Sequence, residues 1–132
     1  MDILARIEDH FRRGEYVQAR RLGEALLALE GVPDREKAAA AHLAAEAAYQ
    51  LDDAQAAIAL ARRAVILAEV AGDLQRCGRA WFRLIGAELM AGDHTEAAEA
   101  ADRFLAGLAD RWPELEAELA GSAHFNVGML HR

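Results

Sequence analysis

The chain has 132 residues, of which 54% are hydrophobic and 28% are charged, and its formal net charge is −7 at pH 7. This length and hydrophobic content are enough for one continuous core, so we expect a single domain spanning residues 1–132. The acidic residues are spread along the chain, which argues against a nucleic-acid partner, because binding to phosphates requires a basic face. A protein or peptide partner with basic or apolar groups fits this charge better.

The sequence gives no indication of a disulfide, a metal site or a membrane segment. Cys77 is the single cysteine, so an internal disulfide is excluded, and no neighbouring residues complete a metal site around it. No window reaches the roughly 18 apolar residues of a membrane-spanning helix. The first residues carry acids where a signal peptide would be basic. We therefore expect a cytoplasmic protein with no membrane association, no cofactor and no bound metal.

Apolar residues recur at spacings of three and four along the whole chain, a pattern typical of helices. In the first helix Ile3, Leu4, Ile7 and Phe11 form one apolar stripe, and Gly14 ends it. The middle of the chain is rich in alanine, the strongest helix former, and no run of alternating β-branched residues predicts a strand. The predicted helices cover about residues 3–13, 17–30, 35–50, 54–71, 74–91, 94–109 and 113–131.

Turn and cap residues mark the boundaries between these helices. Asp34 is the predicted N-cap of the third helix and Asp73 that of the fifth, because an aspartate can accept the backbone amides of the first turn. Gly72 can supply the left-handed residue that ends the fourth helix. Trp112-Pro113 predicts a boundary, with the proline in the first turn of a seventh helix.

Similar turns recur at nearly equal intervals. The stretches 14–19, 52–57 and 92–97 each run from a turn into a helix and end on an alanine. Ala57 follows Ala19 by 38 residues, and Ala97 follows Ala57 by 40. Small residues at these places would allow two helices to approach closely, so the spacing indicates a repeated helical hairpin.

The third of these hairpins resembles a tetratricopeptide repeat (TPR). Trp81 and Leu84 give the Trp-x-x-Leu pattern of the first helix, and the Gly92-Asp93 turn and Ala97 follow in the expected order. Residues 125–128 (Phe-Asn-Val-Gly) are similar to the opening of a further repeat. Repeats near 40 residues would make this a long-helix variant of the family. The resemblance implies an all-α, right-handed solenoid of about seven helices, with hairpins at 1–32, 33–72 and 73–111 and a terminal half-repeat helix at 113–131.

The same resemblance implies a binding groove, because the first helix of each TPR hairpin lines the concave face of the solenoid. The implied groove residues are Glu8, Phe11, Arg12, His42, Glu46, Tyr49, Arg79, Phe82, Leu89 and Met90, with Leu4 at one end of the row and Phe125 and Met129 at the other. Arg12 and Arg79 could hold a carboxylate of a bound peptide through paired donors. The alternatives are that the aromatic residues belong to the core and that the arginines are solvated.

The residues do not assemble into a catalytic site. His42 and Glu46 lie one helical turn apart, but two ligands do not make a metal site, and no Gly-rich phosphate loop or nucleophile–base arrangement is present. We therefore expect a non-catalytic adaptor or scaffold, such as a chaperone or regulatory subunit, that binds a peptide or protein segment in the groove. The alternative is a homo-oligomerisation module, a homodimer formed through Phe125, Met129 and Leu130 on the apolar terminal helix.

Overall fold

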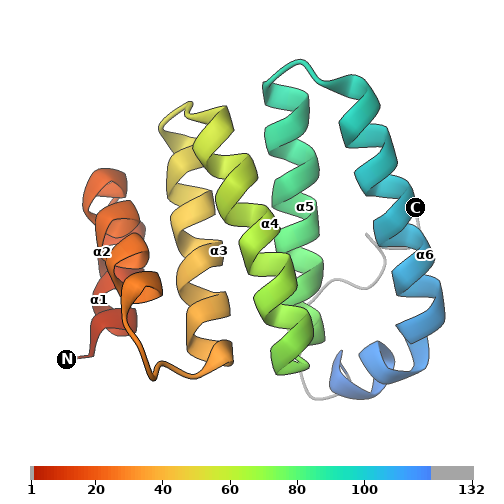
Figure 1. The fold of residues 1–132 in the computed structure, drawn as a ribbon, viewed down its shortest axis with the longest axis horizontal. Helices are drawn as coiled ribbons and strands as arrows, with labels where there is room; N and C mark the ends of the chain where they lie inside the picture. Colours follow the sequence, from red (N-terminus) through yellow and green to blue (C-terminus); the bar gives the residue numbers. More distant parts are fainter. Residues whose placement is uncertain (1, 120–132) are drawn as a thin grey trace.

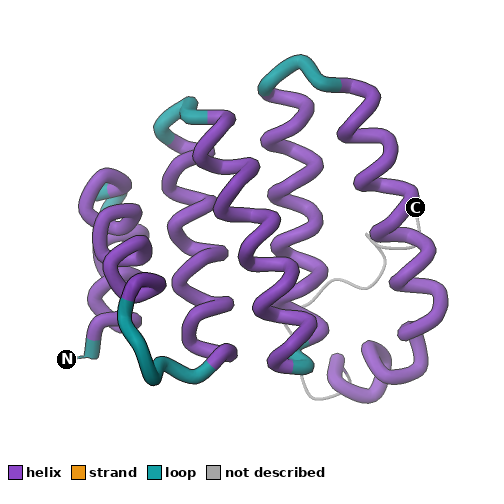
Figure 2. The backbone as a smooth tube through the Cα atoms, in the orientation of Figure 1, coloured by secondary structure: helices purple, strands orange, loops and turns teal. Residues whose placement is uncertain are grey.

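The computed structural model describes residues 2–119, and this part of the chain is all-α, with six helices and no strands. Short turns join successive helices, so that neighbours run in opposite directions (Figures 1 and 2). The helices are α1 (Ile3–Arg12), α2 (Tyr16–Ala28), α3 (Asp34–Gln50), α4 (Ala54–Ala71), α5 (Leu74–Met90) and α6 (His94–Leu119). The predicted all-α class is confirmed, and the bounds of α1 to α5 lie within about two residues of those predicted.

Aspartates begin four of the helices. Asp2, Asp53, Asp73 and Asp93 each accept a backbone amide three residues further on, at distances between 2.8 and 3.2 Å. These bonds satisfy amides that would have no partner inside the helix. Gly72 has φ +70° and ends α4, as predicted. The predicted cap at Asp34 is wrong, because Pro33 occupies the N-cap position and Asp34 is already the first residue of α3.

Each helix packs against its neighbours in the chain, and the odd-numbered helices also touch one another. α2 contacts α1 and α3, α4 contacts α3 and α5, and α6 contacts α5. In addition α1 contacts α3, and α3 contacts α5. Helices α1, α3 and α5 therefore lie side by side and share one face, which we call the α1–α3–α5 face.

Alanine fills much of the core and brings the helix axes close together. The turn-proximal alanines Ala19, Ala57 and Ala97 are all buried, as their recurrence predicts. At Gly23 the helices α2 and α3 approach each other closely. A Cβ atom on Gly23 would lie 2.9 Å from the Cβ of Ala44 and 3.1 Å from the carbonyl oxygen of Ala40. Only glycine fits this position without moving one helix away from the other.

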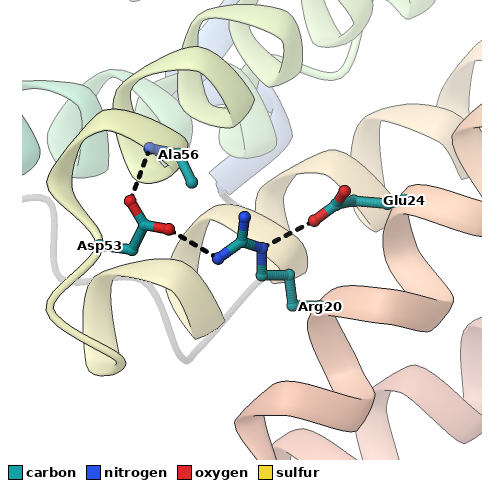
Figure 3. A network of polar contacts seen from close by, with 4 residues as sticks. All are labelled: Arg20, Glu24, Asp53 and Ala56. Atoms are coloured by element: carbon teal, nitrogen blue, oxygen red, sulfur yellow. Dashed lines mark hydrogen bonds and ion pairs between the residues drawn. The ribbon is translucent and has the colours of Figure 1, made fainter.

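A charged contact joins the first two predicted hairpins (Figure 3). Arg20 on α2 donates from Nη1 to Oδ2 of Asp53 (2.8 Å) and from Nε to Glu24 (2.7 Å). Asp53 uses its other oxygen, Oδ1, to accept the Ala56 amide and so to cap α4. These two bonds lower the pKa of Asp53, the amide of Ala56 contributing more than Arg20. The start of α4 is thus attached to the helix that ends the preceding hairpin.

The predicted boundary at Trp112-Pro113 is wrong. Instead of ending near residue 109, α6 continues through Pro113 to Leu119, so the described chain has six helices rather than the seven predicted. Proline can begin a helix or lie inside one at the expense of a backbone hydrogen bond, often with a bend. Figure 1 shows that α6 changes direction in its last, blue turns. The remainder of the predicted helix, residues 120–131, lies outside the described residues.

No helix among the described residues combines the length and the apolar character needed to cross a bilayer.

Candidate functional site

Five side chains from α3 and α5 form a polar cluster, which we call the α3–α5 network: His42, Glu46, Tyr49, Arg76 and Arg83. Glu46 lies at its centre, with Oε2 3.0 Å from Arg83 Nε and Oε1 3.3 Å from His42 Nε2. Arg76 Nη1 lies 3.2 Å from His42 Nδ1. The Arg83 guanidinium carbon stands 3.8 Å above the centre of the Tyr49 ring, a cation–π contact.

The contact with Arg76 fixes the tautomer of neutral His42. Arginine only donates hydrogen bonds, so His42 Nδ1 must accept, and the ring proton must sit on Nε2, which faces Glu46. The buried Nε atoms of both His42 and Arg83 have no well-aligned hydrogen-bond acceptor among the described residues. Their short distances to Glu46 are therefore electrostatic contacts between a carboxylate and two donors that approach it off-axis.

Burial and charge act in opposite directions on this network. Burial raises the pKa of Glu46, but His42 and Arg83 together outweigh that effect, and its pKa lies below the ordinary value. Burial is also the main cause that lowers the pKa of Arg76, although a guanidinium stays protonated at any physiological pH. Glu46 is therefore ionised, and its carboxylate contacts His42 on α3 and Arg83 on α5. The positive charge of Arg83 thus balances the negative charge of Glu46 inside the network.

The start of α5 carries a second group of charges next to the network. Asp73 caps α5 and lies 3.5 Å from Arg35 and 3.9 Å from Arg76. The charges of Glu8 on α1 and Arg79 on α5 also act on Arg76. Charged side chains from α1, α3 and α5 thus gather on the α1–α3–α5 face.

The exposed side of α5 continues this face with apolar side chains. Phe82 is 61% exposed, and Leu89 and Met90 are also exposed. Their spacing places them with Arg79 along one stripe of the helix. The Arg83 guanidinium lies 5.8 Å from the centre of the Phe82 ring, which links this stripe to the α3–α5 network.

The other predicted groove residues lie on α1, apart from the network. Phe11 is half-buried and packs edge-on against Tyr16, with ring centres 5.3 Å apart. Arg12 is exposed and lies 3.6 Å from Asp9, and Glu8 is exposed. The structure brings His42, Glu46 and Tyr49 together and leaves Arg12 near a residue of its own helix. The three predicted interface residues Phe125, Met129 and Leu130 lie outside the described residues.

Arg76 and Arg83 are the network members that the sequence analysis missed. They stand three residues before and four residues after Arg79, so helical spacing alone places all three arginines on neighbouring parts of α5. That signal was available in the sequence. The contacts of Arg83 with Glu46 and Tyr49 were not, because these partners come from another helix.

A further buried carboxylate lies away from this face. Glu88 on α5 is only 2% exposed, and its nearest cation is Arg62 on α4, with Arg62 Nη2 3.8 Å from Glu88 Oε2. Its other oxygen, Oε1, is buried with no hydrogen-bond partner among the described residues. Burial is the main cause that raises the pKa of Glu88, against the opposing effect of Arg62.

Comparison with known proteins adds no assignment to this geometry. No protein-family model, no curated protein and no solved structure matches the chain. Within the described residues, no group of three or more histidine, cysteine, aspartate or glutamate side chains is arranged to hold a metal ion. The α1–α3–α5 face is therefore the candidate functional site.

Proposed function

We propose that the chain is a cytoplasmic, TPR-like solenoid that acts as a non-catalytic adaptor and binds a peptide or protein segment along the α1–α3–α5 face. The observation that carries the proposal is the stripe of Phe82, Leu89 and Met90, three large apolar side chains exposed in line with Arg79. Contiguous exposed apolar surface beside polar residues is typical of an interaction site.

The charges of this face suggest how a bound segment would be oriented. Arg76 and Arg83 already contact His42, Glu46 and Tyr49 within the protein. Arg79 is exposed between them and is the arginine best placed to meet a carboxylate of the partner. Apolar side chains of the partner would cover Phe82 and Leu89. The network below would keep α3 and α5 in fixed register during binding.

Peptide selection tests this proposal directly. Phage-displayed peptides are selected on the wild-type protein, and the affinity of the best peptide is measured by fluorescence anisotropy. Phe82→Ala and Arg79→Glu should each weaken binding by about tenfold or more, because they remove a central apolar contact and reverse a charge. Ile66→Ala is the matched control, because Ile66 on α4 is also 61% exposed but lies on another helix.

Two results would reject the proposal. One is a selection in which no peptide is enriched over a blank surface. The other is a peptide whose affinity changes no more with Phe82→Ala than with Ile66→Ala, while circular dichroism shows that all variants are folded.

The alternative proposal is self-association through Phe125, Met129 and Leu130. It is tested by light scattering over a wide concentration range, where Met129→Glu combined with Leu130→Glu should reduce the mass of a dimer to that of a monomer. An unchanged mass would reject it.

A further inference from the structure

A cavity of about 110 Å³ lies between α5 and α6, on a different side of α5 from the exposed stripe of Phe82 and Leu89. Its wall is mainly apolar and aromatic, with charged side chains from α4 and α6. The lining residues are Glu69, Leu74, Cys77, Gly78, Trp81, Arg103, Phe104, Gly107, Leu108 and Arg111. Trp81 and Phe104 are stacked with ring centres 6.5 Å apart.

Two glycines in the middle of helices leave this volume open. Gly78 and Gly107 face the cavity from α5 and α6, and each destabilises its helix by about 1 kcal/mol relative to alanine. By comparison, helix packing explains the glycine at position 23, because a Cβ there would lie 2.9 Å from the Cβ of Ala44. Among the described atoms, a Cβ on Gly107 would have no neighbour within 4 Å, and one on Gly78 only Phe104 at 4.0 Å. Close helix packing therefore does not explain these two glycines, whereas an open cavity does.

Positively charged side chains outnumber negatively charged ones among the described residues that line the cavity. Arg103 and Arg111 border it from α6, whereas Glu69 is the one acid among the described lining residues and lies on the Cys77 side, 3.9 Å from the Cys77 sulfur. The guanidinium of Arg103 stands 5.8 Å from the centre of the Trp81 ring, at the aromatic end of the cavity. A ligand with its apolar part against Trp81 and Phe104 would thus have a cation within reach of its polar end.

We propose that this cavity is a binding site for a small carboxylate that carries one apolar group about the size of a phenyl ring. The volume of about 110 Å³ limits the apolar group to one ring at most, since an apolar cavity of roughly 150 Å³ accepts a single benzene. The negative charge follows from the two arginines, because a carboxylate accepts paired hydrogen bonds from a guanidinium. The aromatic pair favours a flat ring, which can stack on Trp81 or meet Phe104 edge-on.

Calorimetric titration of the whole chain with phenylacetate tests the site, with 2-phenylethanol as the uncharged comparison. Phenylacetate should bind saturably and at least about fivefold more tightly than 2-phenylethanol, because only the acid can pair with Arg103 or Arg111. Gly107→Leu should weaken binding at least about tenfold, because the new side chain occupies the cavity. Arg103→Gln should reduce the preference for phenylacetate over 2-phenylethanol.

Ala106→Leu provides the matched control, because it places the same leucine side chain at the exposed neighbouring position of α6, and it should bind as the wild type does. Should Gly107→Leu lose helical structure by circular dichroism, Gly78→Ala narrows the same cavity from α5 with no contact shorter than 4.0 Å. The proposal is overturned if phenylacetate gives no saturable heat, or if folded cavity variants bind it as tightly as Ala106→Leu does. Equal affinities for the acid and the alcohol would overturn the assignment of an anionic ligand.

Discussion

The contact between α2 and α3 at Gly23 allows a prediction that runs against helix propensity. In most helix interiors, Gly→Ala stabilises a protein by about 1 kcal/mol, because alanine restricts the unfolded chain and favours the helix. At Gly23 the added Cβ would meet the Cβ of Ala44 at 2.9 Å and the carbonyl oxygen of Ala40 at 3.1 Å. Neither atom belongs to a flexible side chain, so relief requires that the two helices move apart.

The structure sets the expected size of the effect. Ordinary carbon–carbon contacts are about 3.5–4.0 Å, so α2 and α3 would have to separate by roughly 1 Å at this point. Overpacking of this kind costs about 1–3 kcal/mol, which exceeds the gain from helix propensity. We expect Gly23→Ala to lower the free energy of unfolding by about 1 kcal/mol and the thermal midpoint by about 4 °C.

Gly107→Ala is the matched comparison, because this substitution also lies inside a helix but its Cβ has no described atom within 4 Å beyond its chain neighbours and the backbone of its own helical turn. It should raise the free energy of unfolding by about 1 kcal/mol. Urea denaturation followed by circular dichroism measures both changes. Adding Ala44→Gly should partly restore Gly23→Ala by removing one of the two clashing atoms. If Gly23→Ala and Gly107→Ala stabilised the protein equally, the close approach of α2 and α3 would be refuted.

Three further predictions concern titratable groups. Because burial raises the pKa of Glu88, protonation of this side chain favours the folded state. In urea denaturation at pH 7, Glu88→Gln should therefore have a free energy of unfolding about 1 kcal/mol above that of the wild type, and this difference should shrink as the pH falls toward 4.5. A difference in free energy that does not change with pH would contradict the raised pKa. Asp53→Ala should lower the free energy of unfolding by about 1 kcal/mol at pH 7, because the cap of α4 is missing. This loss should diminish below pH 3.8, where protonation weakens the same cap in the wild type. Equal thermal midpoints of Asp53→Ala and the wild type at pH 7 would show that Asp53 does not stabilise α4. Burial raises the pKa of the Cys77 thiol to about 11, so at pH 8 a disulfide reagent should modify it more than about a hundredfold more slowly than in urea, and similar rates would show that the thiol is accessible.

Local signals in the sequence were sufficient to predict α1 to α5. Gly14 and Gly72 end helices with positive φ, and Asp73 begins α5 with a side-chain bond to the backbone. These are interactions between residues three or four apart, so the order of residue types is enough to recognise them. A longer-range signal, the recurrence of alanine at intervals of 38 and 40 residues, singled out Ala19, Ala57 and Ala97, and all three are buried.

The two wrong helix boundaries, at Pro113 and Asp34, involve residue types that can stand either at the start of a helix or inside it. Proline is common in the first turn of a helix, and this preference suggested a new helix at Pro113. In the structure, α6 continues through that residue. Similarly, an aspartate after a proline suggested a cap, yet Asp34 lies inside α3. Neither choice can be made from neighbouring residues, because both depend on where the following helix packs.

The sequence predicted members of the candidate site but not the contacts between α3 and α5. The resemblance to the TPR family implied that His42, Glu46 and Tyr49 on α3 and Arg79, Phe82, Leu89 and Met90 on α5 line one groove. It could not show that Arg83 would reach across to Glu46 and Tyr49, since that contact depends on the rotation of α5 against α3. The cavity was equally inaccessible to sequence reasoning, because Gly78 and Gly107 belong to helices whose separation is known only in three dimensions.

The arginine contacts at the capping aspartates have a consequence for the order in which the protein opens. Arg20 on α2 holds the aspartate that starts α4, and Arg35 on α3 lies 3.5 Å from the aspartate that starts α5. Unfolding of one hairpin therefore weakens the first turn of a helix in the next. Coupling between neighbouring helices of this kind favours cooperative unfolding over fraying from the ends. In native-state hydrogen exchange, the amides of Ala56 and Arg76 would report openings that begin one hairpin away.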